Sequence, residues 1–400
     1  MKRNSLLAVG ALTVVSTSSI AAPYVADARS QAMGNTGVVS ADYLTAPLHN
    51  PALGAMYKDN DDFGILLPAI GANINDQDDS FTLIDDLDST YSDLENNIND
   101  YTNSPNSQSE SDAIANARKL QSGLNSLADN APMTVNAGLS AVIAIPTSYI
   151  SVNLFTTGYV EALVRPEIDV VEGEPSTVEE AADVLSAYDN SQVHLVAFGV
   201  TEFGISFARQ FQIFEQNFSF GFAPKYQYLV TYSQLVTLED FELDDYDQSE
   251  ISKTAFNMDL GAVWYKDAFR VGLSVKDVFK QEIETEIGGY TYELSPKATL
   301  GLGYAGDFFA LSLDADLTTQ KRFKEFDTDD SQFVRVGVEA NAWGWAQLRA
   351  GYEMDLKDNL QNSITAGIGI SPFDVVSLDI AGSYAGENQF GAAANLAFTF

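Results

Sequence analysis

The chain has 400 residues but no cysteine, only 2 histidines and only 21 lysines and arginines. Without cysteine it has no disulfide framework, no thiol redox pair and no cysteine metal site. Its 56 aspartates and glutamates give a net charge of −35. A basic surface for nucleic acid is therefore excluded, and we expect no nucleic-acid partner.

Signatures of catalysis are also missing from the sequence. It contains no nucleophile elbow, phosphate-binding loop or paired-histidine metal motif. Of the two histidines, we expect His49 to support a turn and His194 to lie solvated near a strand end. We therefore predict that the protein is not an enzyme and has no cofactor.

Beyond the amino-terminal leader, the chain lacks any run of about 18 uninterrupted apolar residues that could form a spanning helix. The leader has Lys2 and Arg3, an apolar run from Leu6 to Val15, and small residues up to Ala21. This arrangement predicts a secretory signal peptide over residues 1–21. The chain is then expected to leave the cytoplasm without a helical anchor.

What the sequence does have is a period of two. From Phe390 to Phe400, apolar side chains occupy the even positions and small or polar ones the odd positions, so a strand there would have one apolar and one polar face. The alternation recurs upstream, for example from Phe309 to Leu317 and from Val334 to Asn341. In a soluble sandwich each apolar row needs a covering sheet, whereas in a membrane barrel it faces lipid and the polar row faces the lumen. The pattern favours an all-β protein, a transmembrane antiparallel up-and-down β-barrel.

Turn residues and alternation predict about 14 strands in the region 61–400, with 12 and 16 as the alternatives. Short connections alternate with long acidic ones; in bacterial barrels short turns face the periplasm and long loops face outside. We therefore predict a bacterial outer-membrane location, with outer-membrane lipid and the barrel-assembly machinery as partners. The aromatic residues Phe398 and Phe400 are the candidate carboxyl-terminal assembly signal. The expected strands lie near 63–72, 132–145, 148–164, 192–208, 217–234, 253–266, 268–279, 294–305, 307–319, 332–342, 345–356, 362–371, 374–385 and 388–400.

Two of the long connections carry helical patterns. Apolar residues recur at helical spacing on both sides of a polar breaker at 102–107. We predict a helical hairpin at about 80–130 that caps the extracellular mouth. A shorter helix is predicted from Ser176 to Tyr188, where Thr177 can cap the first turn.

The acidic residues concentrate between the strands, and solvated loops are the favoured interpretation. Divalent-cation binding is the alternative for one run, in which Asp244, Asp245 and Asp247 offer hard oxygen ligands. That run lacks the spacing of an EF-hand loop. It is a weak calcium candidate, and we expect no metal elsewhere.

The segment 22–60 precedes the first strand, and its apolar composition predicts that it packs inside the barrel as a plug. It resembles the amino-terminal plug of the FadL-like outer-membrane family, whose members carry the pattern ARxxxMGxxGVA followed by NPA. The group within that family that it most resembles is the one called plasmid-transfer TraF-like proteins. The matching residues are Ala28, Arg29, Met33, Gly34, Gly37, Val38, Val39, Asn50, Pro51 and Ala52.

The resemblance implies passive uptake of hydrophobic, fatty-acid-like molecules, with a plugged lumen and lateral release into lipid. Thr156, Thr157 and Gly158 interrupt the alternation of the third strand, which suggests a bulge or bend. We take them as a candidate lateral gate; a bulge that only sets curvature is the alternative. A hydrophobic small molecule is then the expected ligand.

Inside the expected barrel, Arg335, Glu339, Arg349 and Glu353 lie on neighbouring strands, and we predict that they pair across the strands. Arg29 of the plug is a candidate partner for a lumenal carboxylate, which would latch the plug. The rival function is that of a non-transporting outer-membrane component of a conjugal transfer or secretion apparatus. A surface adhesin or phage receptor is the third alternative.

Overall fold

The computed structural model describes residues 26–58, 61–239, 249–326, 330–342, 345–372 and 375–400. Fourteen antiparallel strands close into a barrel in which β1 pairs with both β2 and β16, which confirms the predicted fold class and strand number. The barrel strands are β1 Gly64–Asn75, β2 Met133–Ile145, β3 Ser151–Glu167, β4 Gln192–Ile213, β5 Gln216–Thr237, β6 Ile251–Lys266, β7 Phe269–Lys276, β10 Lys297–Ala305, β11 Phe309–Asp316, β12 Phe333–Ala342, β13 Ala346–Asp355, β14 Ser363–Ile370, β15 Val376–Gly386 and β16 Gln389–Thr399.

The strands present an apolar band to the outside because their alternation follows the pleat. In β16 the odd positions from Gln389 to Ala397 are buried, whereas the even positions point outward. Large apolar side chains are exposed on outward faces around the barrel, including Ile70, Leu139, Phe222, Leu260, Leu302, Leu313, Val338, Leu348, Ile368 and Ile380. Such a band is the surface that a barrel turns toward lipid.

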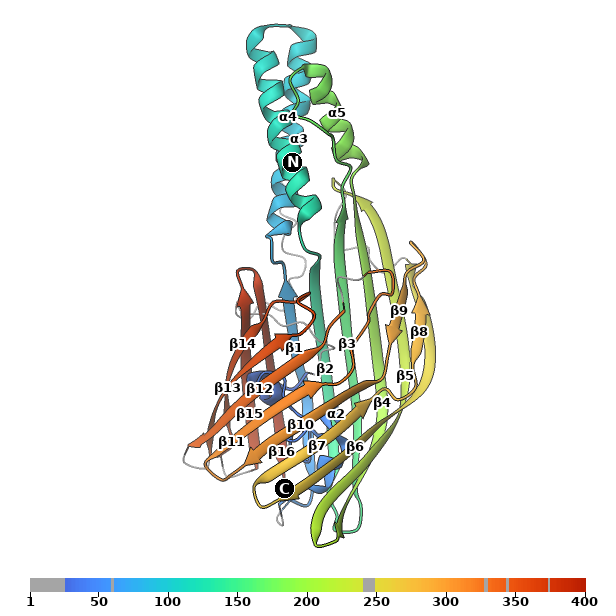
Figure 1. The fold of residues 1–400 in the computed structure, drawn as a ribbon, viewed down its shortest axis with the longest axis vertical. Coiled ribbons are helices and arrows are strands. Elements are labelled where there is room, and N and C mark those ends of the chain that lie inside the picture. The colour runs from blue at the N-terminus through green and yellow to red at the C-terminus, as the bar shows by residue number, and fades with distance from the viewer. Residues whose placement is uncertain (1–25, 59–60, 240–248, 327–329, 343–344, 373–374) are drawn as a thin grey trace.

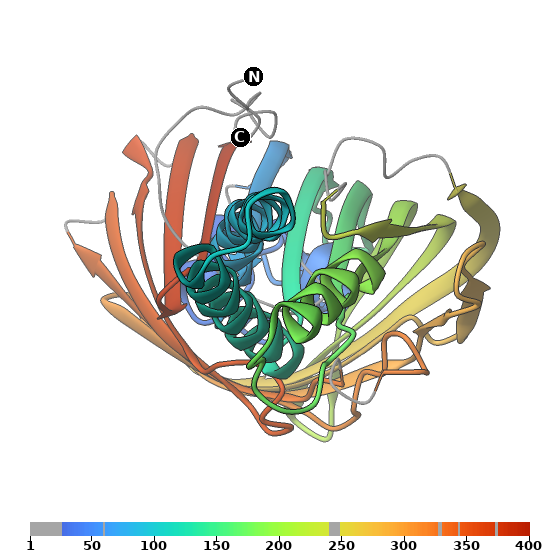
Figure 2. The same cartoon turned by 90° about the horizontal axis from the view of Figure 1, so that it is seen from above.

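Three helices form a tower beyond one end of the barrel, and the carboxyl terminus lies at the opposite end (Figure 1). They are α3 Ser80–Asn103, α4 Ser107–Asp129 and α5 Val178–Asn190. Seen from above, they lie over the barrel opening (Figure 2). Their apolar faces form a common core with inward residues such as Leu94, Leu120 and Val184. None of the helices in the described part of the chain is long and apolar enough to cross a membrane.

Local sequence explains where the tower helices begin. The side chain of Asn106 accepts hydrogen bonds from the first backbone N–H groups of α4. Thr177 and Glu180 form a reciprocal capping box at the start of α5. The breaker between α3 and α4 is short, since only residues 104–106 separate them.

Two connections differ from the sequence-based expectation. The expected loop at 280–293 contains a small separate sheet, β8 Gln281–Glu284 paired with β9 Thr291–Leu294. The expected turn at 210–216 is mostly strand, because β4 and β5 continue to a two-residue turn at Phe214 and Glu215. Both turn residues have positive φ, 50° and 60°, without being glycine. The sequence signal for this tight turn was absent, since neither Asn nor Gly occurs there.

The segment after residue 25 lies inside the barrel. It contains α1 Ala28–Ala32, α2 Ala46–His49 and the 3-10 helix η1 Pro51–Ala55. Most of its residues are buried, and it contacts strands on opposite sides of the wall, β13 to β16 through α1 and β3 to β6 through η1. Residues 26–57 are therefore called the plug.

Candidate functional site

The motif residues of the plug determine its backbone path. Asp27 caps α1 by accepting a hydrogen bond from the backbone N–H of Arg29. Gly34, directly after Met33, has φ of 66°, and a Cβ there would lie within 2.9 Å of backbone atoms of β12 and β13. Only glycine combines this left-handed conformation with such a close approach.

The second half of the motif ties the two ends of the plug together. The side-chain Nδ2 of Asn50 donates to the carbonyl of Val38 at 2.8 Å, and its Oδ1 accepts from the N–H of Ala52 at 3.1 Å. Pro51 occupies the first position of η1, where no N–H is needed. His49 Nε2 lies 2.8 Å from Asp27 Oδ2, so the end of α2 is joined to the start of α1.

Several wall glycines lie where the plug approaches the wall closely. A Cβ on Gly351 would lie 2.1 Å from a backbone nitrogen of the plug, and one on Gly221 would lie 2.4 Å from the carbonyl carbon of Pro51. Similar overlaps with plug atoms occur at Gly261, Gly272, Gly301, Gly303, Gly337 and Gly367. The inner surface of the barrel is therefore shaped to this plug.

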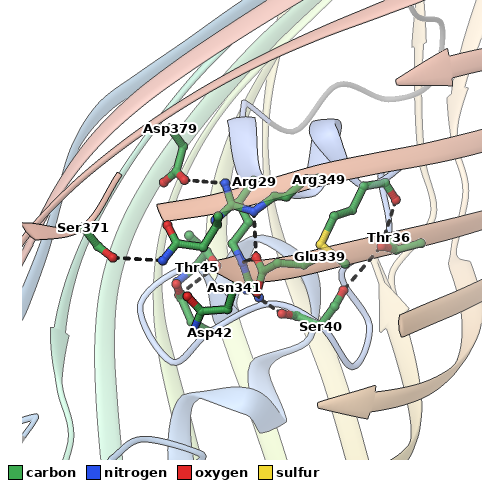
Figure 3. A network of polar contacts seen from close by, with 12 residues as sticks. Arg29, Thr36, Ser40, Asp42, Thr45, Glu339, Asn341, Arg349, Ser371 and Asp379 are labelled. Carbon is green, nitrogen blue, oxygen red and sulfur yellow. Dashed lines mark hydrogen bonds and ion pairs between the residues drawn. The ribbon is translucent and has the colours of Figure 1, made fainter. Parts of the chain in front are cut away.

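An ion-pair network joins the plug to the wall (Figure 3). Arg29 Nε lies 3.0 Å from Glu339 Oε2, and Arg29 Nη1 donates to the carbonyl of Ser40 at 2.6 Å. The same carboxylate of Glu339 receives Arg349 Nε at 2.6 Å, and Arg349 Nη1 lies 2.5 Å from Asp379 Oδ1. The structure thus brings together the latch candidate Arg29 and the predicted pair of Glu339 and Arg349, which are direct cross-strand partners.

The second predicted pair lies on the same two strands, nearer the tower end. Arg335 Nε lies 2.6 Å from Glu353 Oε2, and these residues are also direct cross-strand partners. Arg335 Nη1 reaches Asp316 Oδ1 at 3.0 Å, a contact that strand spacing alone did not indicate. All three side chains are buried.

Polar side chains of the wall satisfy the backbone of the plug. The carboxylate of Asp314 accepts hydrogen bonds from the N–H groups of Gly37 and Val38, at 2.8 and 3.0 Å. The plug has little regular structure, so its amides depend on such partners. Plug carbonyls accept further hydrogen bonds from Asn153, Ser219, Arg270, Ser274 and Lys276.

A cavity of about 120 Å³ remains between the plug and the wall. Its lining is mostly polar and charged, and it has aliphatic contributions from Val38, Leu48 and Leu294. The charged groups that line it are Glu202, Lys225, Lys276, Asp277, Lys297, Asp314 and Arg335. A bare hydrocarbon chain in this cavity would lie against several charged groups.

Lys225 forms a buried ionic cluster on one side of this cavity. Its Nζ lies 3.0 Å from Glu202, 2.9 Å from Asp259 and 2.8 Å from Asp277. Three carboxylates thus surround one fully buried ammonium. This cluster was not predicted from the sequence. The sequence did contain a signal for this cluster, since Lys225, Glu202 and Asp259 occupy lumen-facing positions of adjacent strands.

The tower end of the lumen holds an apolar cluster, beside which Glu161 and Arg322 form a buried ion pair. Inward residues of β3 to β5, among them Phe198, pack against Tyr292 of β9 and against Phe323 and Phe326. The rings of Phe198 and Tyr292 stack with centroids 3.7 Å apart. This group is called the mouth cluster; its buried members are Leu163, Val196, Phe198, Val200, Leu229, Ile283, Tyr292, Leu294, Phe323 and Phe326.

Charged groups hold the β8–β9 hairpin next to the mouth cluster. Glu282 Oε1 lies 2.7 Å from Lys324 Nζ and 3.0 Å from Lys280 Nζ. Hydrogen bonds from Lys324 and Lys280 lower the pKa of Glu282 to about 2.

The bulge predicted at Thr156, Thr157 and Gly158 is not there. Strand β3 pairs with both neighbours through these residues without a register shift. Thr157 faces inward, and its hydroxyl lies 3.0 Å from that of Ser140. The side chains change in polarity here while the strand keeps its regular pleat. The alternation pattern in the sequence could not distinguish this change from a bulge.

The wall is interrupted in β1 instead. Its register shifts after Leu66 against both β2 and β16. Leu67 and Pro68 both point outward at this position, and Pro68 has no N–H for the ladder. Pro68, inside a predicted strand, was the signal that could have found this bulge.

The candidate assembly signal lies at and just beyond the end of β16. Phe398 pairs in register with Ile65 and Val376, and Phe400 is exposed at the barrel end opposite the tower. Asp244, Asp245 and Asp247 lie outside the described residues. His194 is bound by Glu167 and Tyr290 near the mouth, far from His49 in the plug.

Comparison with known proteins identifies the family. A family model described as "F plasmid transfer operon, TraF, protein" matches residues 47–316, more than half of the chain. The chain belongs to this family. No curated protein sequence matches it.

Solved structures share the fold at low sequence identity. The Ralstonia pickettii toluene transporter TbuX has a TM-score of 0.53 and 11% identity, over 93% of this chain and 97% of that chain. A Pseudomonas aeruginosa FadL homologue has a TM-score of 0.52 and 11% identity, over 96% of this chain and 98% of that chain. A deletion mutant of the TodX monoaromatic hydrocarbon channel has a TM-score of 0.51 and 12% identity, over 93% and 98% of the two chains. The TraF-family chain is thus a FadL-like barrel, as the plug motif indicated.

Proposed function

We propose that this TraF-family barrel takes up or binds hydrophobic small molecules in the outer membrane and releases them sideways into lipid. The observation that carries the proposal is the contrast along the lumen. An apolar mouth cluster lies at the tower end, whereas a charged cavity and a fixed plug fill the level below. Moving a hydrophobic molecule through the charged level would cost free energy, so the surrounding lipid is its favourable exit.

Solved structures with the same fold support a role in hydrophobic transport. Proteins of the same architecture are described as a toluene transporter and a monoaromatic hydrocarbon channel. We extend to this chain a non-enzymatic role with a hydrocarbon or fatty-acid-like ligand. The apolar outer band supports outer-membrane lipid as the surroundings, and the barrel-assembly machinery would insert the barrel by reading Phe398 and Phe400.

Two places in the wall are candidates for the lateral exit. The first is the sequence-based candidate at Thr156, Thr157 and Gly158, which remains a proposal although the strand is regular there. The second is the bulge at Leu67 and Pro68, where ladder pairing is already interrupted. A wall opens most easily where hydrogen bonds are missing.

The absence of native cysteine allows each exit to be locked by an engineered disulfide. Ile70→Cys with Ala394→Cys would staple β1 to β16 beside the bulge, since these residues are direct partners. Ala141→Cys with Thr156→Cys would staple β2 to β3 at the other candidate. The matched control is Ile380→Cys with Ala394→Cys, which staples an uninterrupted part of the wall.

The assay is uptake of radiolabelled toluene and oleate by cells that lack the gene and carry each variant. We expect uptake with the wild-type gene, and a loss on oxidation that a reductant restores in one of the two gate variants but not in the control. If cells without the gene take up both compounds at the wild-type rate, hydrophobic uptake is wrong. If every oxidised staple leaves uptake unchanged, lateral release is wrong.

A role in conjugal transfer is the second candidate, favoured by the family description and the tower. The tower can be removed cleanly, because Asn75 and Thr134 are direct partners at its base. We would replace residues 76–133 by a two-residue turn, and remove α5 from the same variant because it packs on α4. Normal uptake with lost plasmid transfer would favour this candidate; normal transfer would exclude a role for the tower.

A further inference from the structure

Two lysines lie side by side on the wall of the lumenal cavity. Lys276 ends β7, Lys297 begins β10, and the two residues are direct partners in the antiparallel ladder. Both line the cavity. Directly opposite residues have Cβ atoms about 5 Å apart, and like charges in this position destabilise a sheet.

The neighbouring acids compensate these lysines poorly. Lys276 Nζ donates to the carbonyl of Leu48 at 2.8 Å, and no carboxylate among the described residues forms a salt bridge with it. Lys297 Nζ lies 3.4 Å from Asp316 Oδ2. That carboxyl group is shared, because it also binds Arg335 and the hydroxyl of Thr299.

The carboxylates that line the cavity are engaged elsewhere. Glu202 and Asp277 are bound to Lys225, at 3.0 and 2.8 Å. Asp314 accepts two backbone N–H groups of the plug. Two ammonium groups thus line one cavity whose carboxylates are bound mainly to other groups.

We propose that Lys276 and Lys297 form a binding site for a small organic carboxylate. Its negative group would lie between the two ammonium groups and relieve their repulsion. The cavity of about 120 Å³ limits the ligand to a compact molecule, because an ordinary ligand pocket has roughly 300 Å³ or more. Leu48, Leu294 and Tyr159 offer surface for its apolar part, and Thr299 and Ser274 offer hydroxyl groups.

A monoanion fits this cavity better than phosphate does. Glu202, Asp277 and Asp314 also line it, and they repel a dianion more strongly than a monoanion. The site does not rest on hydrocarbon uptake, since both lysines lie at the charged level of the lumen; Leu294 lines the cavity and also belongs to the mouth cluster.

The test is calorimetric titration of the purified full-length barrel in detergent with sodium benzoate, and with inorganic phosphate at matched ionic strength. The variants are Lys276→Gln, Lys297→Gln and Lys276→Arg, and the control is Lys266→Gln, an exposed lysine at the end of β6. Heat-dependent gel mobility checks that each barrel is folded. Toluene uptake is measured in parallel, so that failure of the site and failure of the proposed function can be told apart.

We expect benzoate to bind the wild type and Lys266→Gln, and the glutamine variants to bind it at least about 10-fold more weakly, or ~1.4 kcal/mol. Lys276→Arg should retain binding because it keeps the charge. Without benzoate, the glutamine variants should unfold at a higher temperature than the wild type. Absence of benzoate binding, equal binding by the glutamine variants, or tighter binding of phosphate would each overturn the proposal.

Discussion

Replacing Arg29 by glutamine should loosen the plug without unfolding the barrel. Arg29 makes two hydrogen bonds to Glu339, at 3.0 and 3.3 Å, and one to the carbonyl of Ser40, at 2.6 Å. The side chains of Arg29 and Glu339 are 20% and 14% exposed, so solvent screens this pair only in part. The strands do not depend on this pair, because their ladder hydrogen bonds join strand to strand and do not involve Arg29.

The size of the effect depends on the contacts that Glu339 retains. A hydrogen bond to a charged group contributes about 1.5–3 kcal/mol. Leaving a buried charge entirely alone costs about 3–5 kcal/mol, but Glu339 keeps its contact with Arg349. We therefore expect Arg29→Gln to lower the free energy of local plug opening by about 2 kcal/mol, which corresponds to roughly a 30-fold change in the open population.

The cysteine-free chain makes this opening measurable. Ser30 is 4% exposed and lies next to Arg29 in α1, so Ser30→Cys introduces a hidden thiol of nearly the same size. Its reaction rate with a water-soluble maleimide reports plug opening in the folded barrel. Arg29→Lys should give an intermediate rate, and Arg209→Gln, on the outer face of β4, should give the parent rate.

Equal labelling rates for the parent and Arg29→Gln would refute the latch. The same rate with Glu339→Gln would show that neither side of the pair holds the plug. A loss of heat-dependent gel mobility in Arg29→Gln would instead show that the barrel depends on the plug for its stability.

Three other predictions concern the wall, a helix cap and a turn. Gly351→Ala should destabilise the barrel by about 1–3 kcal/mol through overlap with the plug backbone, whereas Gly382→Ala should not, since its Cβ meets nothing nearer than 4.0 Å; equal unfolding temperatures would contradict this. Glu180 has a pKa lowered from 4.5 by hydrogen bonds from a backbone N–H and a serine hydroxyl, so its stabilisation of α5 is complete above pH 4.5 and lost as the pH falls through the lowered value. Hydrogen exchange of α5 should show this loss in the wild type and not in Glu180→Gln. Phe214→Asn with Glu215→Gly should raise the unfolding temperature, because each positive-φ residue costs about 1–2 kcal/mol; a lower temperature would show that Phe214 contributes more than the turn strain.

The sequence was sufficient for the barrel because lipid and lumen impose opposite demands on alternate residues. Each barrel strand, such as β16 at Gln389–Thr399, shows the resulting alternation within its own sequence. The tower helices were also predictable, since their periodicity and the caps at Asn106 and Thr177 are local. The β8–β9 sheet was not, because its four-residue strands depend on packing against the mouth cluster.

Contacts between lumenal side chains could be predicted only where the two residues are direct partners on adjacent strands. Arg335 with Glu353, and Arg349 with Glu339, follow from the alignment of β12 with β13. The contacts of Asp314 with the plug could not be inferred, because 277 positions along the chain separate it from Gly37. The bulge expected at Thr156 to Gly158 illustrates the opposite error, since a change of polarity along a strand does not imply a change of pleat.

By itself the sequence determined a closed barrel and a helical cap, because these depend on patterns repeated within single elements, and it indicated the plug through an apolar segment that resembles a family motif. Only the tertiary structure decided where the plug touches the wall, where the wall is interrupted, and that Lys276 and Lys297 share one cavity. These features arise from the joint position of segments distant along the chain. The residues next to a side chain in the sequence do not indicate which distant segment it contacts.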